Sequence, residues 1–356
     1  MNKKILVAMS GGVDSTVTAC LLREAGYDCI GATMRLFSLS DIAFSTTRSC
    51  CDPEEIALAR GVAEQLGTPF SVCDYSEAFR KNVIEYFVQT YIDGATPNPC
   101  VQCNRTMKFG VLFDEARARG CDGIATGHYA RIEQTVGGRY RLLRAKDASK
   151  DQTYVLWSLS QEQLSRTHFP LGNFTKAEVR EIAAAHGFSN AARHDSQDIC
   201  FVPDGDYAAF IENYTGKDFP AGDFVSLDGR VLGRHNGAIR YTVGQRKGLG
   251  LSLGAPTYVC SKDVYKNTVT LGSNADLFRS ELTAHDINLI SVDRIDSPMR
   301  VQAKIRYQAL AAPAVVEQTS PSTLTVRFDE PQRAITSGQS VVLYNGDVVV
   351  GGGIID

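Results

Sequence analysis

Six residues near the N-terminus have the types and spacing of an anion-binding loop. The sequence S-G-G-V-D-S at residues 10–15 follows the apolar run K-K-I-L-V and precedes a segment with helical spacing. A glycine-rich turn before a helix points several backbone N–H groups at one spot, where the helix dipole adds partial positive charge. Ser10 and Ser15 add hydroxyl donors, and we expect Asp14 to orient Mg²⁺ or to cap the helix. The Walker loop requires a lysine that this segment lacks, so it does not fit that phosphate-binding motif.

Three cysteines with polar neighbours form the second candidate group. Cys100 and Cys103 make a C-x-x-C pair in T-P-N-P-C-V-Q-C-N-R, and Cys200 lies in H-D-S-Q-D-I-C-F-V. If the pair begins a helix, the helix dipole and Arg105 or Lys108 should lower the pKa of the thiols and favour the thiolate. Half of a zinc site is the structural alternative, but the sequence has no second C-x-x-C to complete it.

The remaining composition indicates an intracellular globular chain. Its 356 residues include ten cysteines, of which Cys20, Cys29, Cys73 and Cys121 have apolar or helical neighbours and are expected to be buried. The vicinal pair at residues 50–51 is expected in a solvent-facing loop. No run approaches the roughly 20 apolar residues that span a bilayer, and glycine and aspartate come too early for a secretion signal. We therefore expect a cytoplasmic protein with thiols rather than structural disulfides.

The net charge of −3 gives no sign of a basic surface. A nucleic-acid partner would therefore have to meet a local patch that the fold assembles from distant residues.

The elements that would position these residues alternate between strand and helix in the first half of the chain. Short apolar runs predict strands, and segments of helical spacing that end at glycine predict helices. Their alternation predicts an α/β fold with a parallel sheet and helices on both faces. Strands are expected at residues 3–9, 28–37, 69–75 and 121–129, and helices at 14–25, 52–67, 76–91, 108–119, 151–165 and 175–186.

The second half of the chain is dominated by short strands. A hairpin is predicted at residues 131–144, and another at the Asp-Gly pair of residues 228–229. From about residue 280 only strand patterns remain, which a small closed barrel would accommodate without exposed edges. We expect three domains, namely a catalytic domain at residues 1–203, a central β-rich domain at 204–276 and a C-terminal β-barrel at 277–356.

The loop and the cysteine segments together resemble those of a known family. S-G-G-V-D-S resembles the pyrophosphate loop (PP-loop) of the ATP pyrophosphatases, which cleave ATP between the α and β phosphates. With T-P-N-P-x-x-x-C-N, A-T-G-H-Y-A, K-D-Q-T-Y, D-I-C-F-V and Y-T-V-G-Q-R-K-G-L-G-L, the chain resembles the tRNA-specific 2-thiouridylases over almost its whole length. The resemblance implies an N-terminal domain of the adenine-nucleotide alpha-hydrolase-like (PP-loop) type.

This family uses ATP, with Mg²⁺, to activate O2 of the wobble uridine in the anticodon arm of certain tRNAs and then replaces that oxygen by sulfur. The sulfur arrives as a cysteine persulfide from a relay protein or a cysteine desulfurase. An adenylated oxygen is a good leaving group, and a soft nucleophile such as cysteine suits the second step. An amide-forming ligase with the same loop is the rival interpretation, although it would have no need of the cysteines. A binding module that has lost catalysis is disfavoured by the intact Ser10, Asp14 and Ser15.

The resemblance also implies a role for each matching residue. Cys200 would carry the persulfide, and Cys103 would act as nucleophile or close a disulfide as sulfide is released. ATP contacts would come from Ala8, Met9, Ser10, Gly11, Gly12, Val13, Asp14, Ser15, Met34 and Gly127. Asn98, Pro99 and Cys100 would face the target base, and His128, Lys150, Asp151, Gln152, Arg306, Tyr307 and Gln339 would contact tRNA.

Cys100 departs from the family pattern, because many members have aspartate at this position. Three thiolates from Cys100, Cys103 and Cys200 could hold a [4Fe–4S] cluster with one open iron, similar to the arrangement in cluster-dependent tRNA thiolases. We expect the three cysteines to converge, and both the persulfide and the cluster mechanism stay open at this point.

Overall fold

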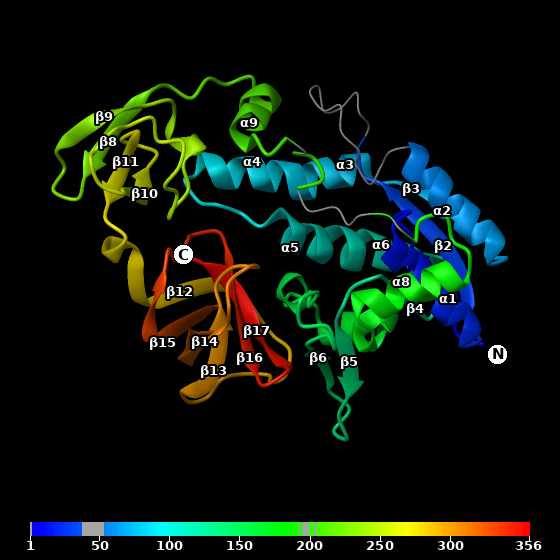
Figure 1. The fold of residues 1–356 in the computed structure, drawn as a ribbon. Coiled ribbons are helices and arrows are strands. Elements are labelled where there is room, and N and C mark those ends of the chain that lie inside the picture. Colours follow the sequence, from blue (N-terminus) through cyan, green and yellow to red (C-terminus); the bar gives the residue numbers. More distant parts are fainter. Residues whose placement is uncertain (1, 38–52, 192, 194–198, 203) are drawn as a thin grey trace.

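The computed structural model describes residues 2–37, 53–191, 193, 199–202 and 204–356. It contains an α/β part, a small central sheet and a C-terminal barrel, arranged as in Figure 1. This α/β, β and β-barrel order confirms the predicted fold class. The expected loop at residues 50–51 lies outside the described residues.

The N-terminal domain is built on a five-stranded parallel sheet of order β3-β2-β1-β4-β7. Alternate residues of its central strand face opposite layers. Ile5 and Val7 pack with α1 (Val13–Glu24), α2 (Pro53–Gln65) and α8 (Lys176–Ala185), whereas Leu6 packs with η2 (Asn104–Val111) and α6 (Leu112–Ala118). Helices therefore cover both faces, as predicted. The strands are β1 (Lys4–Ala8), β2 (Asp28–Arg35), β3 (Phe70–Asp74), β4 (Gly123–Ala125) and β7 (Thr167–His168). The helices α1 (Val13–Glu24), α2 (Pro53–Gln65) and α8 (Lys176–Ala185) share the first layer.

Two long helical segments contain π-helical stretches. One consists of α3 (Ser76–Phe79), η1 (Arg80–Ile84) and α4 (Glu85–Ile92), and runs from the sheet toward the central domain in Figure 1. The other consists of α5 (Pro99–Cys103), η2 (Asn104–Val111) and α6 (Leu112–Ala118). The sequence predicted this second helix only from about residue 108, yet helical structure begins at Pro99.

The helix expected at residues 151–165 is mostly absent from the structure. This segment forms the short 3₁₀ helix η3 (Thr153–Val155) and α7 (Gln161–Ser165), which are joined by irregular chain. Tyr154 and Trp157 are fully buried and donate hydrogen bonds to the backbone O and the Oγ of Ser340 in the barrel, at 2.8 and 3.0 Å. Packing against the barrel thus overrides the local helical pattern. The 3₁₀ helix η4 (Pro170–Asn173) then leads into α8.

The central domain begins with α9 (Tyr207–Thr215), which the sequence analysis missed. Its sheet has the order β10-β11-β8-β9 and surrounds a small core that includes Phe224 and Tyr241. The strands are β8 (Gly222–Ser226), β9 (Val231–His235), β10 (Tyr258–Asp263) and β11 (Thr268–Gly272), with the 3₁₀ turns η5 (Ala238–Arg240) and η6 (Ala275–Leu277) beside them.

The C-terminal domain is a closed antiparallel barrel of order β12-β15-β14-β13-β16-β17, because β12 also pairs with β17. The predicted hairpin of the first half, β5 (Arg131–Gln134) and β6 (Tyr140–Leu143), extends the barrel sheet where Leu143 pairs with Val348 (Figure 1). The barrel strands are β12 (Phe278–Leu289), β13 (Met299–Lys304), β14 (Ala312–Ser320), β15 (Thr323–Arg333), β16 (Ser340–Asn345) and β17 (Val348–Ile355). Among the described residues, no helix is long and apolar enough to cross a membrane.

Candidate active site

The glycine-rich loop and all three candidate cysteines line one cavity of about 340 Å³, here called the active-site cavity. Its walls come from the carboxyl ends of β1, β2 and β4, from α5 and from the short segment 199–201. Carboxyl ends of parallel strands are the usual place for ligand binding in open α/β sheets. The predicted residues that line it are Ala8, Met9, Ser10, Asp14, Ser15, Met34, Pro99, Cys100, Cys103, Gly127, His128, Gln152 and Cys200.

The loop between β1 and α1 is braced tightly. Gly11 has a φ of +81°, and a Cβ there would lie 2.5 Å from the backbone oxygen of Glu55, so only glycine fits. Asn190 Nδ2 donates to Gly11 O and to the hydroxyl of Thr16, both at 2.8 Å. A Cβ on Gly127 would lie 2.9 Å from the backbone carbon of Asp14. The backbone of the A-T-G-H turn therefore lies against the backbone of the loop, with no room for a side chain at residue 127.

Asp14 is held by two side chains that the sequence analysis did not identify. Lys176 Nζ donates to both carboxylate oxygens at 2.8 and 2.9 Å, and the Tyr129 hydroxyl donates to Oδ1 at 2.8 Å. Lys176 is the first residue of α8, where Thr175 caps the helix. The cap of α1 is Gly12 without a side-chain hydrogen bond, so Asp14 does not cap the helix as expected. Lys176 contacts both oxygens of Asp14, and Mg²⁺ commonly binds through one or two carboxylates together with substrate phosphates and water, so a contact of Asp14 with Mg²⁺ remains a prediction.

The C-x-x-C pair does begin a helix, since Cys100 and Cys103 lie in α5. The Asn98 side chain caps this helix by accepting from the N–H groups of Cys100 and Val101 at 3.1 and 3.3 Å. The predicted lowering of the thiol pKa is wrong for Cys100. Cys100 is solvent-exposed where it faces the cavity; Lys108 lowers the pKa of its thiol as predicted, but desolvation by the surrounding protein raises that pKa by more.

Arg105 does not support the thiols as predicted. Its guanidinium forms an ion pair with Asp286 in barrel strand β12, with Nη2 to Oδ1 at 3.0 Å. This pair instead connects the cysteine-bearing helix to the C-terminal domain.

Cys200 is held at the cavity by its neighbours. Phe201 and Val202 are buried in an apolar cluster, where the Phe201 ring makes edge contacts with Phe79 and Phe87 at centroid distances of 5.7 and 5.2 Å. Cys200 itself is half-buried and faces the cavity that contains Cys100 and Cys103. The three cysteines thus converge on one space, as expected from the sequence.

His128 lies at the floor of the cavity rather than on an outer surface. It is 6% exposed, and burial followed by the neighbouring Lys108 lowers its pKa well below the ordinary value. Lys108 Nζ lies 3.5 Å from Nε2, and the Thr126 hydroxyl lies 2.6 Å from Nδ1. Because lysine can only donate, we assign the imidazole proton to Nδ1. The ring is therefore neutral.

Two of the expected tRNA contacts make internal hydrogen bonds. Buried Asp151 accepts from Ala145 N–H and the Thr153 hydroxyl at 3.0 and 2.7 Å. Gln152 exchanges hydrogen bonds with the backbone of Tyr129, both at 2.9 Å, and so supports the tyrosine that binds Asp14. Their assignment to tRNA remains a prediction.

Gln339 also bonds within the protein. Its amide nitrogen donates to the carbonyl oxygens of Thr96 and Pro97 at 2.9 and 3.3 Å, and Thr96 N–H donates to Ser337 O at 2.8 Å. These bonds tie the segment before α5 to the barrel. A tRNA contact by Gln339 remains a prediction.

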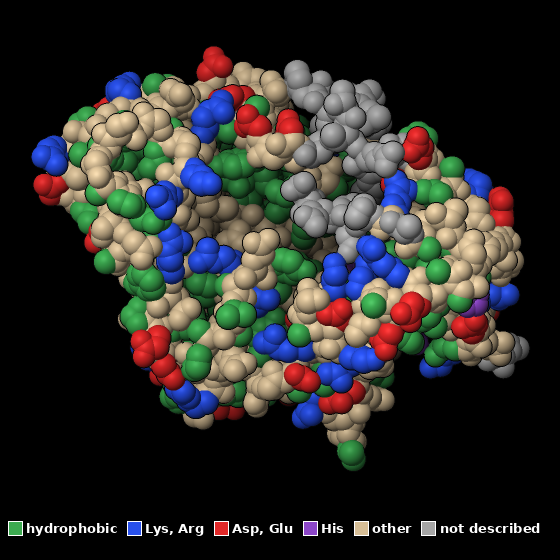
Figure 2. All heavy atoms as spheres, in the orientation of Figure 1, with side chains coloured by type: hydrophobic (Ala, Val, Ile, Leu, Met, Phe, Trp, Pro, Cys, Tyr) green, Lys and Arg blue, Asp and Glu red, His purple; other side chains and the backbone are tan. Residues whose placement is uncertain are grey.

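Barrel residues bring positive charge and an aromatic ring beside Tyr154 of the α/β domain, since Lys304 Nζ lies 5.8 Å and the Tyr307 ring centre 6.0 Å from the centre of the Tyr154 ring. Tyr307 is 40% exposed, and burial raises its pKa, followed by the nearby Asp151 and Cys100. Lys304 Nζ lies 5.5 Å from the centre of the Tyr307 ring. Arg306 donates to the backbone oxygen of Arg333 at 2.7 Å, and burial followed by Arg333 lowers its pKa. Figure 2 shows Lys and Arg side chains around the hollow between the domains, although the net charge is negative.

The site lacks the geometry of a single-ion metal centre. Among the described residues, Cys100, Cys103 and Cys200 belong to no group of three ligand atoms that lie within 4.8 Å of one another. A [4Fe–4S] cluster places its thiolates on different irons and needs wider spacing, so this geometry does not exclude it.

The residues missed by the sequence analysis are Tyr129, Lys176 and Asn190. Tyr129 stands in the A-T-G-H-Y segment, so its proximity to the loop had a signal. Lys176 had a weaker one, because T-K-A-E at residues 175–178 forms a capping box and so marks a helix start. Only the three-dimensional packing of α8 beside α1 reveals that the lysine reaches the loop.

Comparison with known families adds three matching models that together span nearly the whole chain. They are described as a tRNA methyl transferase HUP domain at residues 3–204, a tRNA methyl transferase PRC-barrel domain at 208–273 and an aminomethyltransferase beta-barrel domain at 279–355.

Curated relatives match over their full length. The chain is 48% identical over 357 residues to the tRNA-specific 2-thiouridylase MnmA of Clostridioides difficile strain 630, covering 100% of this chain and 99% of that protein. It is 49% identical over 355 residues to the same-named protein of Acetivibrio thermocellus, covering 99% of each. Among solved structures, a 4-thiouridine synthetase–RNA complex with bound ATP aligns with a TM-score of 0.37 at 17% identity, over 60% of this chain and 50% of that one, which is too distant to support an argument.

Proposed function

Since the chain belongs to the tRNA-specific 2-thiouridylase family, we propose that the active-site cavity carries out both steps of an ATP-dependent thiolation of the wobble uridine of tRNA. The observation that supports this most directly is the convergence of the glycine-rich loop with Cys100, Cys103 and Cys200 on one space. An amide-forming ligase would need the loop but not the thiols. A tRNA substrate also implies that the enzyme acts in the cytoplasm.

The first step is adenylation of the uridine. O2 of the base attacks the α-phosphorus of ATP, and the bond between the α- and β-phosphates breaks, so that pyrophosphate leaves with the electron pair. The N–H groups at the start of α1 and the hydroxyl of Ser10 are the donors that would hold the phosphates. The Ser15 hydroxyl donates to Gly12 O at 2.9 Å and would have to turn from it to join them. Lys176 and Tyr129 keep Asp14, and thereby the first turn of α1, in position.

The second step is transfer of sulfur. The terminal sulfur of a persulfide on Cys200 attacks C2 of the base, and the C2–O bond breaks to release AMP. The thiolate of Cys103 then attacks Sγ of Cys200, which leaves the sulfur on the base and joins the two cysteines in a disulfide. The electrons that restore the two thiols must come from an external thiol reductant. A persulfide-carrying relay protein or a cysteine desulfurase supplies the sulfur.

Recognition of the base involves the barrel in this proposal. The uridine must leave its stack to enter the cavity, and an exposed aromatic ring near the entrance can stack on a displaced base. Tyr307 is suited to this because its ring is 40% exposed and lies edge-on to the buried Tyr154 at a centroid distance of 6.0 Å. The neighbouring cations of Lys304 and Arg306 would meet the phosphate backbone.

Serine substitution of the cysteines tests the proposal. We expect Cys103→Ser and Cys200→Ser to abolish formation of 2-thiouridine while tRNA-dependent release of pyrophosphate continues. Cys260→Ser is the matched control, because Cys260 is a half-buried cysteine in β10, which takes no part in the cavity. Two of the matching family models are described as tRNA methyl transferase domains. Mass spectrometry of the nucleosides therefore also serves to distinguish replacement of oxygen by sulfur from addition of a methyl group. Full thiolation by Cys200→Ser would contradict the assignment.

A [4Fe–4S] cluster held by Cys100, Cys103 and Cys200 is the second candidate for the sulfur step, and the shared cavity of the three thiols favours it. Anaerobic reconstitution with iron and sulfide would then give visible absorbance that Cys100→Ser removes. Full thiolation by iron-free enzyme would rule the cluster out.

A further inference from the structure

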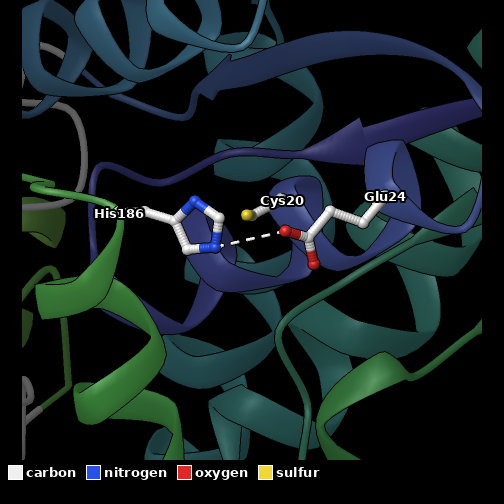
Figure 3. Close-up of side chains that lie close together, drawn as sticks. All are labelled: Cys20, Glu24 and His186. Carbon is white, nitrogen blue, oxygen red and sulfur yellow. Dashed lines mark ion pairs between the residues drawn. The ribbon is translucent and has the colours of Figure 1, made fainter.

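We propose that Cys20, Glu24 and His186 form a binding site for one Zn²⁺-type ion on the α/β domain, separate from the active-site cavity. One sulfur, one carboxylate oxygen and one imidazole nitrogen from these residues lie within 4.8 Å of one another. Figure 3 shows the sulfur of Cys20 beside the line that joins the imidazole to the carboxylate. None of the three is among the described residues that line the active-site cavity.

Two helices bring these side chains together. Cys20 and Glu24 are four residues apart on α1 and therefore share one face of the helix. His186 is the C-cap residue of α8, where Gly187 with a φ of +68° turns the chain away. Its Nε2 lies 3.2 Å from Glu24 Oε1, and its ring stacks on Phe188 at a centroid distance of 5.7 Å.

The donor set suits zinc. Thiolate, imidazole and carboxylate are the three ligand types that Zn²⁺ takes in proteins, and three protein ligands leave a fourth tetrahedral position for water. The His186 and Glu24 side chains are 37% and 55% exposed, whereas Cys20 is 1% exposed. An ion can therefore arrive from solvent between the imidazole and the carboxylate, with the sulfur as the floor of the site.

Without metal the cysteine is a neutral thiol. Burial, and after it the carboxylate of Glu24, raises the pKa of Cys20 to about 11. Metal binding breaks the S–H bond, forms a metal–sulfur bond and releases one proton to solvent, with no change of oxidation state. The two positive charges of the ion balance the thiolate and the carboxylate, which offsets both the desolvation of the buried sulfur and the repulsion from Glu24.

The site would fasten α1 to α8 at their C-terminal ends. The N-terminal ends of the same two helices are already joined by the ion pair of Lys176 with Asp14 in the loop. A bound ion should therefore stabilise the packing of α1 against α8, and with it the position of the glycine-rich loop that precedes α1.

Cobalt binding to the full-length protein tests the site. Cys50, Cys51, Cys100, Cys103 and Cys200 are first replaced by serine, so that other thiols able to bind metal do not contribute. We expect one equivalent of Co²⁺ to give intense tetrahedral d–d bands with a thiolate charge-transfer band, and Zn²⁺ to displace it. Cys20→Ala should remove the thiolate band and Cys260→Ala should keep it.

Variants of the exposed ligands separate metal binding from folding. His186→Gln and Glu24→Gln should weaken Co²⁺ binding by at least about tenfold while melting like the parent in the presence of chelator. Zn²⁺ should raise the melting temperature of the parent and not that of His186→Gln. Absence of a thiolate band, or a band that survives Cys20→Ala, would overturn the proposal.

Discussion

Loss of the Lys176 amine should destabilise the protein and impair use of ATP together. The Lys176 side chain is 10% exposed and its amine contacts both oxygens of Asp14, whose side chain is 30% exposed. Removing one partner of a fully buried pair costs about 3–5 kcal/mol, because the other charge is left uncompensated. Asp14 retains some water and the Tyr129 hydroxyl, so we expect about 2–3 kcal/mol for Lys176→Met.

A matched control is the lysine that pairs with Glu178, another residue of α8. Lys146 Nζ contacts both oxygens of Glu178 at 2.8 and 3.0 Å, but these side chains are 51% and 42% exposed. An exposed pair contributes only about 0–1 kcal/mol, so Lys146→Met should have little effect. The difference between the two variants measures burial rather than charge.

Urea unfolding of the full-length protein measures the loss of stability, and steady-state kinetics measures the loss of ATP use. If the variant loses the same 2–3 kcal/mol of transition-state stabilisation because the glycine-rich loop is no longer held in place, kcat/KM for ATP should fall by roughly 30- to 150-fold. In the double variant Asp14→Asn with Lys176→Met, stability should recover in part because no buried charge remains, whereas ATP use should not. Additive stability losses in this cycle, or unchanged kcat/KM in Lys176→Met, would refute the coupling of Lys176 to the loop.

Four further substitutions have defined outcomes. Because the pKa of His128 is lowered in the folded protein, the unfolded chain binds a proton at this histidine more readily. The stability that neutral His128 contributes is therefore present above about pH 6.5 and is lost as pH falls toward the lowered pKa. His128→Asn should flatten this part of a plot of unfolding free energy against pH. Gly172→Ala should prevent folding, because its Cβ would lie 1.9 Å from Ala130 O, whereas Gly61→Ala on α2, with nothing within 4 Å, should stabilise by about 0.5–1 kcal/mol in thermal melts. Gln339→Ala should lower thiolation more than it lowers tRNA affinity in filter binding, because it releases the carbonyls before α5.

Most of the fold could be predicted because its signals are local. The buried strand at Lys4–Ala8, the helix at Pro53–Gln65 and the strands of the barrel all carry their patterns in consecutive residues. The failures occur where distant packing decides. Residues 151–165 bury Trp157 against the barrel instead of continuing a helix, and the hairpin at Arg131–Leu143 joins a sheet formed by the other end of the chain.

The candidate site could be predicted in its residue types but not in its electrostatics. Spacing identified the loop and the cysteines, and the three thiols do meet in one cavity. The sequence could not show that Arg105 turns to Asp286, or that the surroundings of Cys100 raise rather than lower its pKa. Both depend on which atoms fill the space around a side chain, and that information is distributed over all three domains.

The bonds between the barrel and the segment before α5 make the two domains mechanically continuous. Thr96 and Pro97 are anchored to Ser337 and Gln339, and Arg105 grips the barrel from the far side of the cysteine pair. Rotation of the barrel relative to the α/β domain would therefore break these bonds or move the helix of Cys100 and Cys103. A nucleic acid bound to the barrel would therefore influence the orientation of the two thiols before the reaction begins. An N-terminal domain without the barrel would retain the cysteines but lack the bonds that orient them.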